Sequence, residues 1–177
     1  MSVVESASLQ AQLVDILRLA YSGEMAAGYA YRGHAASVSD PAERTHILEI
    51  EAEEWQHRRL IGDMLRTLGT EPSRGREFRA AIIGRTLGAL CHTSGWFLPM
   101  YGAGRLESRN IREYEVAARL ARAAGHEEWV DCLLSMAEVE WEHEAWFRER
   151  VLSHRIGARM RLWSAPPPKQ SIRALAH

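Results

Sequence analysis

The spacing of the apolar residues constrains the fold of this chain most strongly, because they recur at steps of three and four along four long stretches. This is the period of one face of an α-helix, and no run of alternating β-branched residues indicates a strand. We therefore expect an all-α fold with helices over about residues 8–36, 41–68, 101–124 and 127–154. Asp40-Pro41 supplies an N-cap and a first-turn proline for the second helix, and Gly125 a stop for the third.

The breakers between these stretches predict how the helices are connected. Short turns follow the first and third helices, whereas about 30 residues separate the second helix from the third. This pattern predicts two helical hairpins joined by a long helical crossover, which is a four-helix bundle over residues 1–163. We expect an amphipathic connector over residues 77–98 that ends at Pro99, and a flexible tail over residues 164–177 that contains three consecutive prolines.

Each of the four helices carries a carboxylate on its otherwise apolar stripe, and two of them also carry a histidine one turn later. The inward-facing set is Glu24, Glu54, His57, Glu107, Glu140 and His143. A buried charged carboxylate costs several kcal/mol unless a cation compensates it, and no arginine or lysine lies on these stripes. The pattern therefore predicts a metal site built from these six side chains.

Spacing supports the same six residues. Glu54-x-x-His57 and Glu140-x-x-His143 place a carboxylate and an imidazole on one helical face. Counted from the turn of each hairpin, Glu24 lies at the depth of Glu54, and Glu107 lies at nearly the depth of Glu140. This arrangement matches the di-iron or di-manganese ligand pattern of ferritin-like bundles. A third pair, Glu43-x-x-His46, has no carboxylate at its depth on the first helix, and we interpret it as a solvated chance match.

Other polar residues on the helices receive weaker interpretations. Tyr31 and Tyr114 each follow a predicted ligand by seven residues, so they are candidates to hydrogen-bond the ligands, with plain core packing as the alternative. Four further glutamates close to the predicted ligands are expected to be solvated: Glu113, Glu115, Glu142 and Glu144.

Composition excludes several function classes. The chain has 22 basic and 23 acidic residues and a net charge of −1, which argues against a nucleic-acid partner. Its two cysteines, Cys91 and Cys132, form no CxxC motif, which excludes a rubredoxin-like iron site and suggests a reducing compartment. The N-terminus has no signal-peptide pattern and no apolar run reaches the roughly 20 residues that span a bilayer, so we expect a cytoplasmic protein.

Four sequence segments resemble the demethoxyubiquinone hydroxylase family, a ferritin-like group of di-iron monooxygenases in ubiquinone biosynthesis. They are LRLAYSGEMAAGYAYRGH (17–34), EAEEWQH (51–57), RLESRNIREY (105–114) and VEWEH (139–143), and the resemblance covers about residues 13–152. The chain departs from the family where Gly33-His34 replaces a Gly-Gln pair. It also lacks the usual double Glu and His-Tyr context on the third helix.

The resemblance implies a role for each ligand and a reaction. Glu24 would be a terminal ligand beside His57, Glu107 a terminal ligand beside His143, and Glu54 and Glu140 would bridge two iron ions, with manganese as the other metal such ligands suit. The reduced pair would activate O2 or peroxide to hydroxylate a quinone-like or other apolar substrate. The electrons would come from an external donor, because the sequence has no CxxC iron site and no nucleotide fingerprint.

Two alternative functions and two roles of the connector stay open. A rubrerythrin-like peroxidase or ferroxidase would use the same metals without an organic substrate, and a metal-stabilised bundle would not be an enzyme. The connector, residues 77–100, could make a peripheral contact with the inner face of the membrane through its aromatic and arginine residues, or could cap the bundle or form a homodimer interface.

Overall fold

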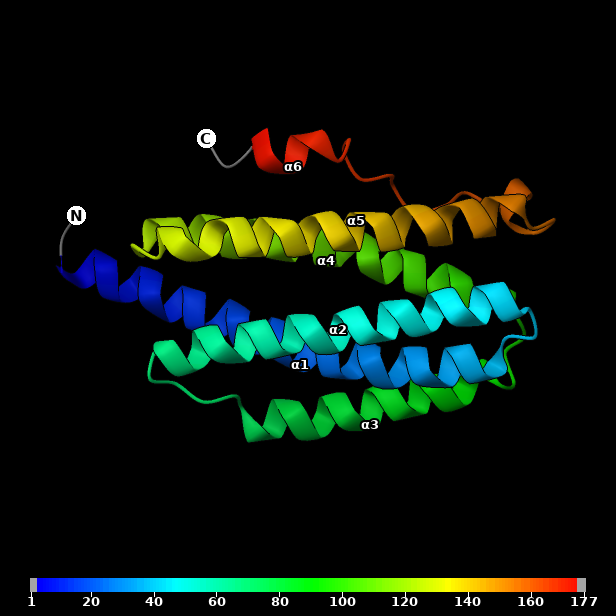
Figure 1. The fold of residues 1–177 in the computed structure, drawn as a ribbon, viewed down its shortest axis with the longest axis horizontal. Helices are drawn as coiled ribbons and strands as arrows, with labels where there is room; N and C mark the ends of the chain where they lie inside the picture. The colour runs from blue at the N-terminus through cyan, green and yellow to red at the C-terminus, as the bar shows by residue number, and fades with distance from the viewer. Residues whose placement is uncertain (1–2, 175–177) are drawn as a thin grey trace. The chain divides into compact units, whose positions relative to one another are not determined.

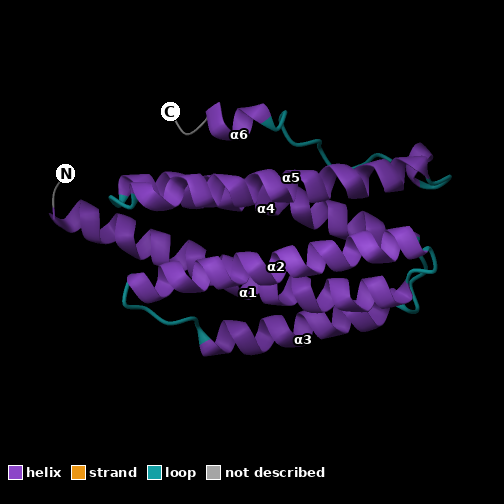
Figure 2. Cartoon of the chain, viewed as in Figure 1, coloured by secondary structure: helices purple, strands orange, loops and turns teal. Residues whose placement is uncertain are grey.

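The computed structural model describes residues 3–174, and all regular structure in that range is helical (Figures 1 and 2). The helices are α1 (Val3–Ser37), α2 (Pro41–Thr67), α3 (Arg74–Cys91), α4 (Phe97–Ala123), α5 (Val130–Ser153) and α6 (Gln170–Ala174), with short 3-10 turns η1 (Glu127–Trp129) and η2 (Gly157–Arg159). The prediction of an all-α bundle is confirmed. The chain divides into two compact units, Leu17–Pro99 and Met1–Ile16 together with Met100–His177, and each is described by itself.

In the unit Leu17–Pro99, α1 and α2 form an antiparallel hairpin (Figure 1). The Asp40 carboxylate accepts a hydrogen bond from the Glu43 backbone nitrogen at 2.9 Å, and Pro41 is the first helical residue, as the sequence predicts. Gly69 ends α2 with a φ of 63°, while Gly69 and Thr70 donate backbone hydrogen bonds to Arg66 and Leu65. These caps fix where the hairpin turns and where α2 stops.

Helix α3 packs on α1 through glycines. A Cβ atom added at Gly84 would lie 2.4 Å from the carbonyl oxygen of Ala26, and one added at Gly33 would lie 2.4 Å from the Cα of Gly88. The two backbones therefore approach more closely than any residue with a side chain allows. The opposite surface of α3 carries exposed apolar residues, which are Phe78, Ile82, Ile83, Leu87 and Leu90.

The end of the predicted connector differs from the expectation. Helix α3 stops at Cys91 rather than running to residue 98, and Pro99 lies inside the first turn of α4, which begins at Phe97. Proline is tolerated there because the first-turn backbone nitrogens of a helix have no intrahelical acceptor. The prediction that Pro99 ends the connector was therefore wrong, and the proline belongs to the start of the next helix.

In the second unit, α4 and α5 form an antiparallel hairpin (Figure 1). Gly125 has a φ of 89°, and Gly125 and His126 donate backbone hydrogen bonds to Arg122 and Ala121, so the predicted glycine stop of α4 is confirmed. The helices approach closely at Gly104, where an added Cβ would lie 2.9 Å from the Cβ of Phe147.

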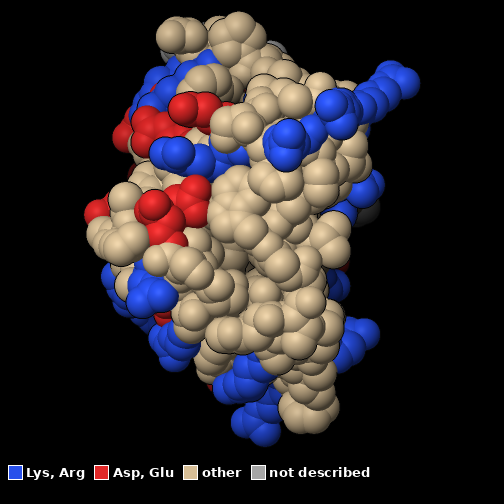
Figure 3. Space-filling model, turned by 90° about the vertical axis from the view of Figure 1, so that its right-hand side faces the viewer, with Lys and Arg blue, Asp and Glu red and all other residues tan. Residues whose placement is uncertain are grey.

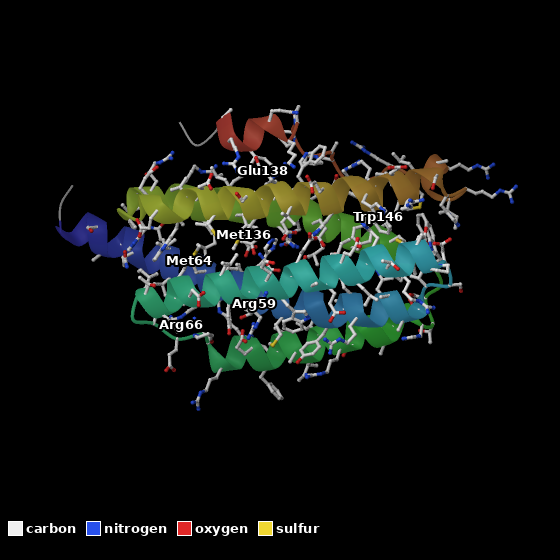
Figure 4. All side chains as sticks on the ribbon, in the orientation of Figure 1. Arg59, Met64, Arg66, Met136, Glu138 and Trp146 are labelled. Carbon is white, nitrogen blue, oxygen red and sulfur yellow. The ribbon has the colours of Figure 1, made fainter. Side chains whose placement is uncertain are left out.

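The C-terminal part of the chain returns along α5. The indole of Trp141 donates a hydrogen bond to the carbonyl of Pro167 at 2.9 Å, and Arg173 on α6 is bonded to Glu138 and Asp131. Glu138 lies on the side of α5 that faces α6 (Figure 4). Residues 164–174 of the expected tail therefore include a short helix in contact with α5, and residues 175–177 lie outside the described residues. The boundary at residue 163 stays a prediction.

Within residues 3–174, no helix combines the length and the apolar character that crossing a bilayer requires.

Candidate metal centre

Three of the predicted ligands belong to the α1–α2 hairpin. Glu24 lies on α1, and Glu54 and His57 lie one turn apart on α2, and all three side chains are buried. Glu24 and His57 each offer a ligand atom within 4.8 Å of the other. The hairpin therefore brings Glu24 and His57 together, and Glu54 lies buried one turn before His57 on α2.

The other three predicted ligands belong to the α4–α5 hairpin. Glu107 lies on α4, and Glu140 and His143 lie one turn apart on α5, again all buried. Ligand atoms of the three residues lie within 4.8 Å of one another, and Glu140 Oε2 is 3.9 Å from His143 Nδ1. Two atoms that bind the same first-row metal ion at about 2.1 Å lie roughly 3–4 Å apart, so the Glu140–His143 pair is within reach of one ion.

Asn110 belongs to the second set, and the sequence analysis missed it. Its Nδ2 donates hydrogen bonds to Glu107 Oε2 at 3.0 Å and to Glu140 Oε2 at 3.4 Å. The available signal was its position three residues after Glu107, which is the spacing that His57 and His143 have from their own glutamates. The amide orients both carboxylates, and each carboxylate keeps lone pairs that a metal could use.

Glu51, a buried carboxylate outside the predicted set, is compensated by an arginine. It forms an ion pair with Arg32 at 2.7 Å and accepts a hydrogen bond from the Trp55 indole at 3.1 Å. The same indole packs against Gly28, where an added Cβ would lie 2.6 Å from the ring. Gly28 therefore makes room for Trp55 beside the α1–α2 ligands.

Glu144 is buried, although the sequence analysis predicts a solvated side chain. It is 1% exposed, and it accepts hydrogen bonds from Arg148 Nε at 2.8 Å and from the Trp163 indole at 2.6 Å. The prediction was wrong because Trp163, 19 residues away, covers this face of α5. Glu115 is buried as well, and burial raises the pKa of its carboxyl. Glu142 is exposed, as expected, beside Lys169.

The remaining candidates lie where the sequence places them on their helices. Tyr31 and Tyr114 are both buried, and a role in bonding the ligands stays a prediction. The third pair differs from the other two: the His46 side chain is 38% exposed and lies 3.2 Å from Glu49, while Glu43 accepts a hydrogen bond from the Trp96 indole. This setting agrees with a solvated position.

The two ligand sets have the same composition, namely one glutamate from one helix and a Glu-x-x-His pair from its antiparallel partner. Hard carboxylate oxygens combined with imidazole nitrogen suit iron and manganese better than they suit thiol-preferring metals. The donor set therefore fits the metals that the sequence predicts.

Comparison with protein families identifies one match. A family model described as "Ubiquinone biosynthesis protein COQ7" matches residues 11–108, more than half of the chain. This range contains Glu24, Glu54, His57 and Glu107. The resemblance to the ferritin-like hydroxylases is thereby confirmed.

Curated relatives share a shorter stretch. A protein named 3-demethoxyubiquinol 3-hydroxylase from Francisella tularensis subsp. novicida (strain U112) is 36% identical over 58 residues, which is 33% of this chain and 28% of the relative. A protein of the same name from Francisella tularensis subsp. tularensis (strain SCHU S4 / Schu 4) gives the same figures. The match thus spans less than a third of these relatives. No solved structure matches significantly.

Proposed function

Because the chain belongs to the ubiquinone biosynthesis protein COQ7 family, within the ferritin-like di-iron superfamily, we propose that it is a di-iron hydroxylase acting on a quinone-like substrate. One observation carries the proposal: the six carboxylate and imidazole side chains predicted as ligands are all buried, with one glutamate and one Glu-x-x-His pair on each helical hairpin. We propose that the two sets serve a single centre with two metal ions.

Charge balance supports two ions. Four ionised glutamates contribute four negative charges, and two Fe(II) ions contribute four positive charges, so a loaded centre would be neutral in an interior where net charge is costly. Two Fe(II) ions would supply oxygen activation and two electrons per turnover, which an external donor would then restore. Manganese fits the same donors, and metal analysis distinguishes the two.

Each ligand would have a task that its position allows. Glu24 with His57 and Glu107 with His143 would hold one ion each, while Glu54 and Glu140, which are completely buried, would bridge the ions. The histidines must be neutral to bind a metal.

Tyr31 and Tyr114 would act on the ligands rather than on the metals. Each lies two helical turns from a glutamate of its own set, Glu24 or Glu107, and is buried. We propose that their hydroxyl groups hydrogen-bond polar groups near the centre and restrict the movement of its carboxylates.

The substrate and the electrons would reach the proposed centre from outside the protein. The relatives' name refers to a ubiquinol, and we propose a quinone-like molecule with an apolar chain as the substrate here. The exposed apolar residues of α3 would contact the membrane surface from which such a molecule is drawn. An external donor would supply the electrons, because the sequence has neither a CxxC iron site nor a nucleotide fingerprint.

Metal content per chain tests the centre. After anaerobic reconstitution with Fe(II), we expect two iron ions per chain and an optical spectrum that changes on exposure to oxygen. Glu54→Ala and Glu140→Ala should each lose at least one ion, whereas the matched control His46→Ala, from the solvated Glu-x-x-His pair, should keep both. Two ions per chain in both glutamate variants would refute the ligand assignment.

Product analysis tests the reaction. Chemically reduced iron protein supplied with oxygen and a short-chain demethoxyquinol should give one hydroxylated product per centre in a single turnover. Rapid peroxide consumption without any hydroxylated product would instead favour the rubrerythrin-like alternative.

The α3 contact has its own test. We expect the Ile83→Ser/Leu87→Ser variant to sediment less with neutral phosphatidylcholine vesicles than the unmodified protein, because both side chains are exposed and apolar. Unchanged sedimentation would exclude α3 as the contact.

A further inference from the structure

The turn that follows α5 concentrates basic and apolar side chains on the surface. We call residues 152–161 (LSHRIGARMR) the basic turn. It contains three exposed arginines, Arg155, Arg159 and Arg161, alternating with exposed apolar residues. No aspartate or glutamate occurs between residue 149 and His177, so local charge has one sign, although the whole chain is nearly neutral.

The charges of the basic turn are not compensated. Within the described residues, none of the three guanidinium groups forms an ion pair or a hydrogen bond, in contrast to those of Arg148 before the turn and Arg173 after it. Figure 3 looks toward the end of the molecule where α5 terminates, and several basic side chains project from its upper part. An anion with several negative groups would find free guanidinium donors here, each able to bind phosphate oxygens in pairs.

The basic turn also exposes apolar side chains. Leu152, Ile156 and Met160 are each between 45% and 49% exposed, and each is followed in the sequence by one of the three arginines. A free phosphate or a nucleic acid offers nothing to these side chains, whereas a lipid bilayer offers phosphate at its surface and acyl chains just beneath.

The conformation of the basic turn is fixed by its own contacts. Backbone hydrogen bonds join Ala158 to His154, Arg159 to Ile156 and Met160 to Gly157, all at 3.0–3.1 Å. Gly157 packs so tightly against the end of α5 that an added Cβ would lie 1.8 Å from the Val151 carbonyl oxygen. The side chains are therefore presented on a preformed turn, which lowers the entropy cost of binding.

We propose that the basic turn binds an anionic phospholipid surface. The inference deepens the proposed membrane contact, but it lies outside the family match at residues 11–108 and uses no metal. The two contacts differ physically, because α3 would bind through apolar burial alone and the basic turn mainly through charge. Binding through the basic turn should therefore require anionic lipid and weaken with salt.

Vesicle sedimentation of the full chain tests the proposal. We compare vesicles of phosphatidylcholine alone with vesicles containing about 30% phosphatidylglycerol, at low and high salt. Arg155→Gln/Arg159→Gln/Arg161→Gln should lower partitioning onto the anionic vesicles about 100-fold at low salt, since each arginine near such a surface contributes about fivefold. The variant should sediment with neutral vesicles as the unmodified protein does.

A charge-matched control separates this site from bulk charge. Arg105→Gln/Arg112→Gln/Arg119→Gln removes three exposed arginines from α4, two of which lie near Glu115. This variant should keep most of its anionic-vesicle binding. Equal loss in the two triple variants, or no loss in the basic-turn variant, would overturn the proposal. Binding to immobilised heparin tests a soluble polyanion as the ligand instead. The proposal would also be wrong if the basic-turn variant lost heparin binding but kept its vesicle binding. Ile83→Ser/Leu87→Ser should leave the salt-dependent part of the binding to anionic vesicles unchanged. The α3 contact and the basic-turn contact can therefore be refuted independently of each other.

Discussion

The glycine contact between α1 and α3 permits a quantitative prediction for Gly84→Ala. The new methyl carbon would lie 2.4 Å from the Ala26 carbonyl oxygen and 2.8 Å from its Cα, and both atoms belong to backbone that cannot rotate away. Overpacking of this kind costs about 1–3 kcal/mol, and we take the upper end because backbone must move. The better helix propensity of alanine offsets about 1 kcal/mol of this cost, so the free energy of unfolding should fall by about 2 kcal/mol.

Gly75→Ala is the matched control for this prediction. It is the second residue of the same helix, and an added Cβ there meets nothing within 4 Å. Only a propensity gain applies, and in the first turn it should be smaller than the ~1 kcal/mol of a helix interior. Urea unfolding followed by circular dichroism measures both free energies of unfolding, and Tm should fall by roughly 4–8 °C in Gly84→Ala. Equal stabilisation of both variants would show that α3 does not pack on α1 as described.

Three further predictions concern single residues. Burial lowers the pKa of His34 to about 4, so folding favours its neutral form: stability should be constant above pH 6.5 and fall by about 3 kcal/mol as the pH drops toward 4. His34→Gln should remove that part of the pH dependence in urea titrations, and an unchanged slope would contradict the assignment. Asn110→Ala should weaken iron binding about 10–100-fold without unfolding the protein, as measured by competition with a chelator, because Glu107 and Glu140 lose a shared donor. Gly125→Ala should destabilise the protein by about 1 kcal/mol in urea unfolding, because its φ of 89° is unfavourable for any residue with a Cβ, and a neutral effect would count against the described end of α4.

The burial of the six predicted ligands was predictable because it follows from periodicity. A glutamate on an apolar stripe must face the interior if the helix forms at all, and the structure buries all six of the predicted ligands, including Glu54 and Glu140 at 0% exposure. The caps at Asp40 and Gly125 were predictable for a similar reason, since each depends only on neighbours in the sequence.

The features that escaped prediction depend on residues distant in the sequence. Gly84 and Gly33 look like weak points in helical stretches, and only the approach of two helices makes them necessary. Glu144 has the spacing of a solvated residue until Trp163 covers it. Asn110 resembles an ordinary polar residue until the carboxylate of Glu140, from another helix, lies beside its amide.

The contact between Trp163 and Glu144 also bears on when the protein can acquire metal. Glu144 directly follows His143, and its buried charge is shared between Arg148 and the Trp163 indole. During synthesis the ribosome makes His143 twenty residues before Trp163. We therefore expect α5 to reach its final packing only after Trp163 has emerged, so that the proposed centre would take up metal after translation of its helices and not during it.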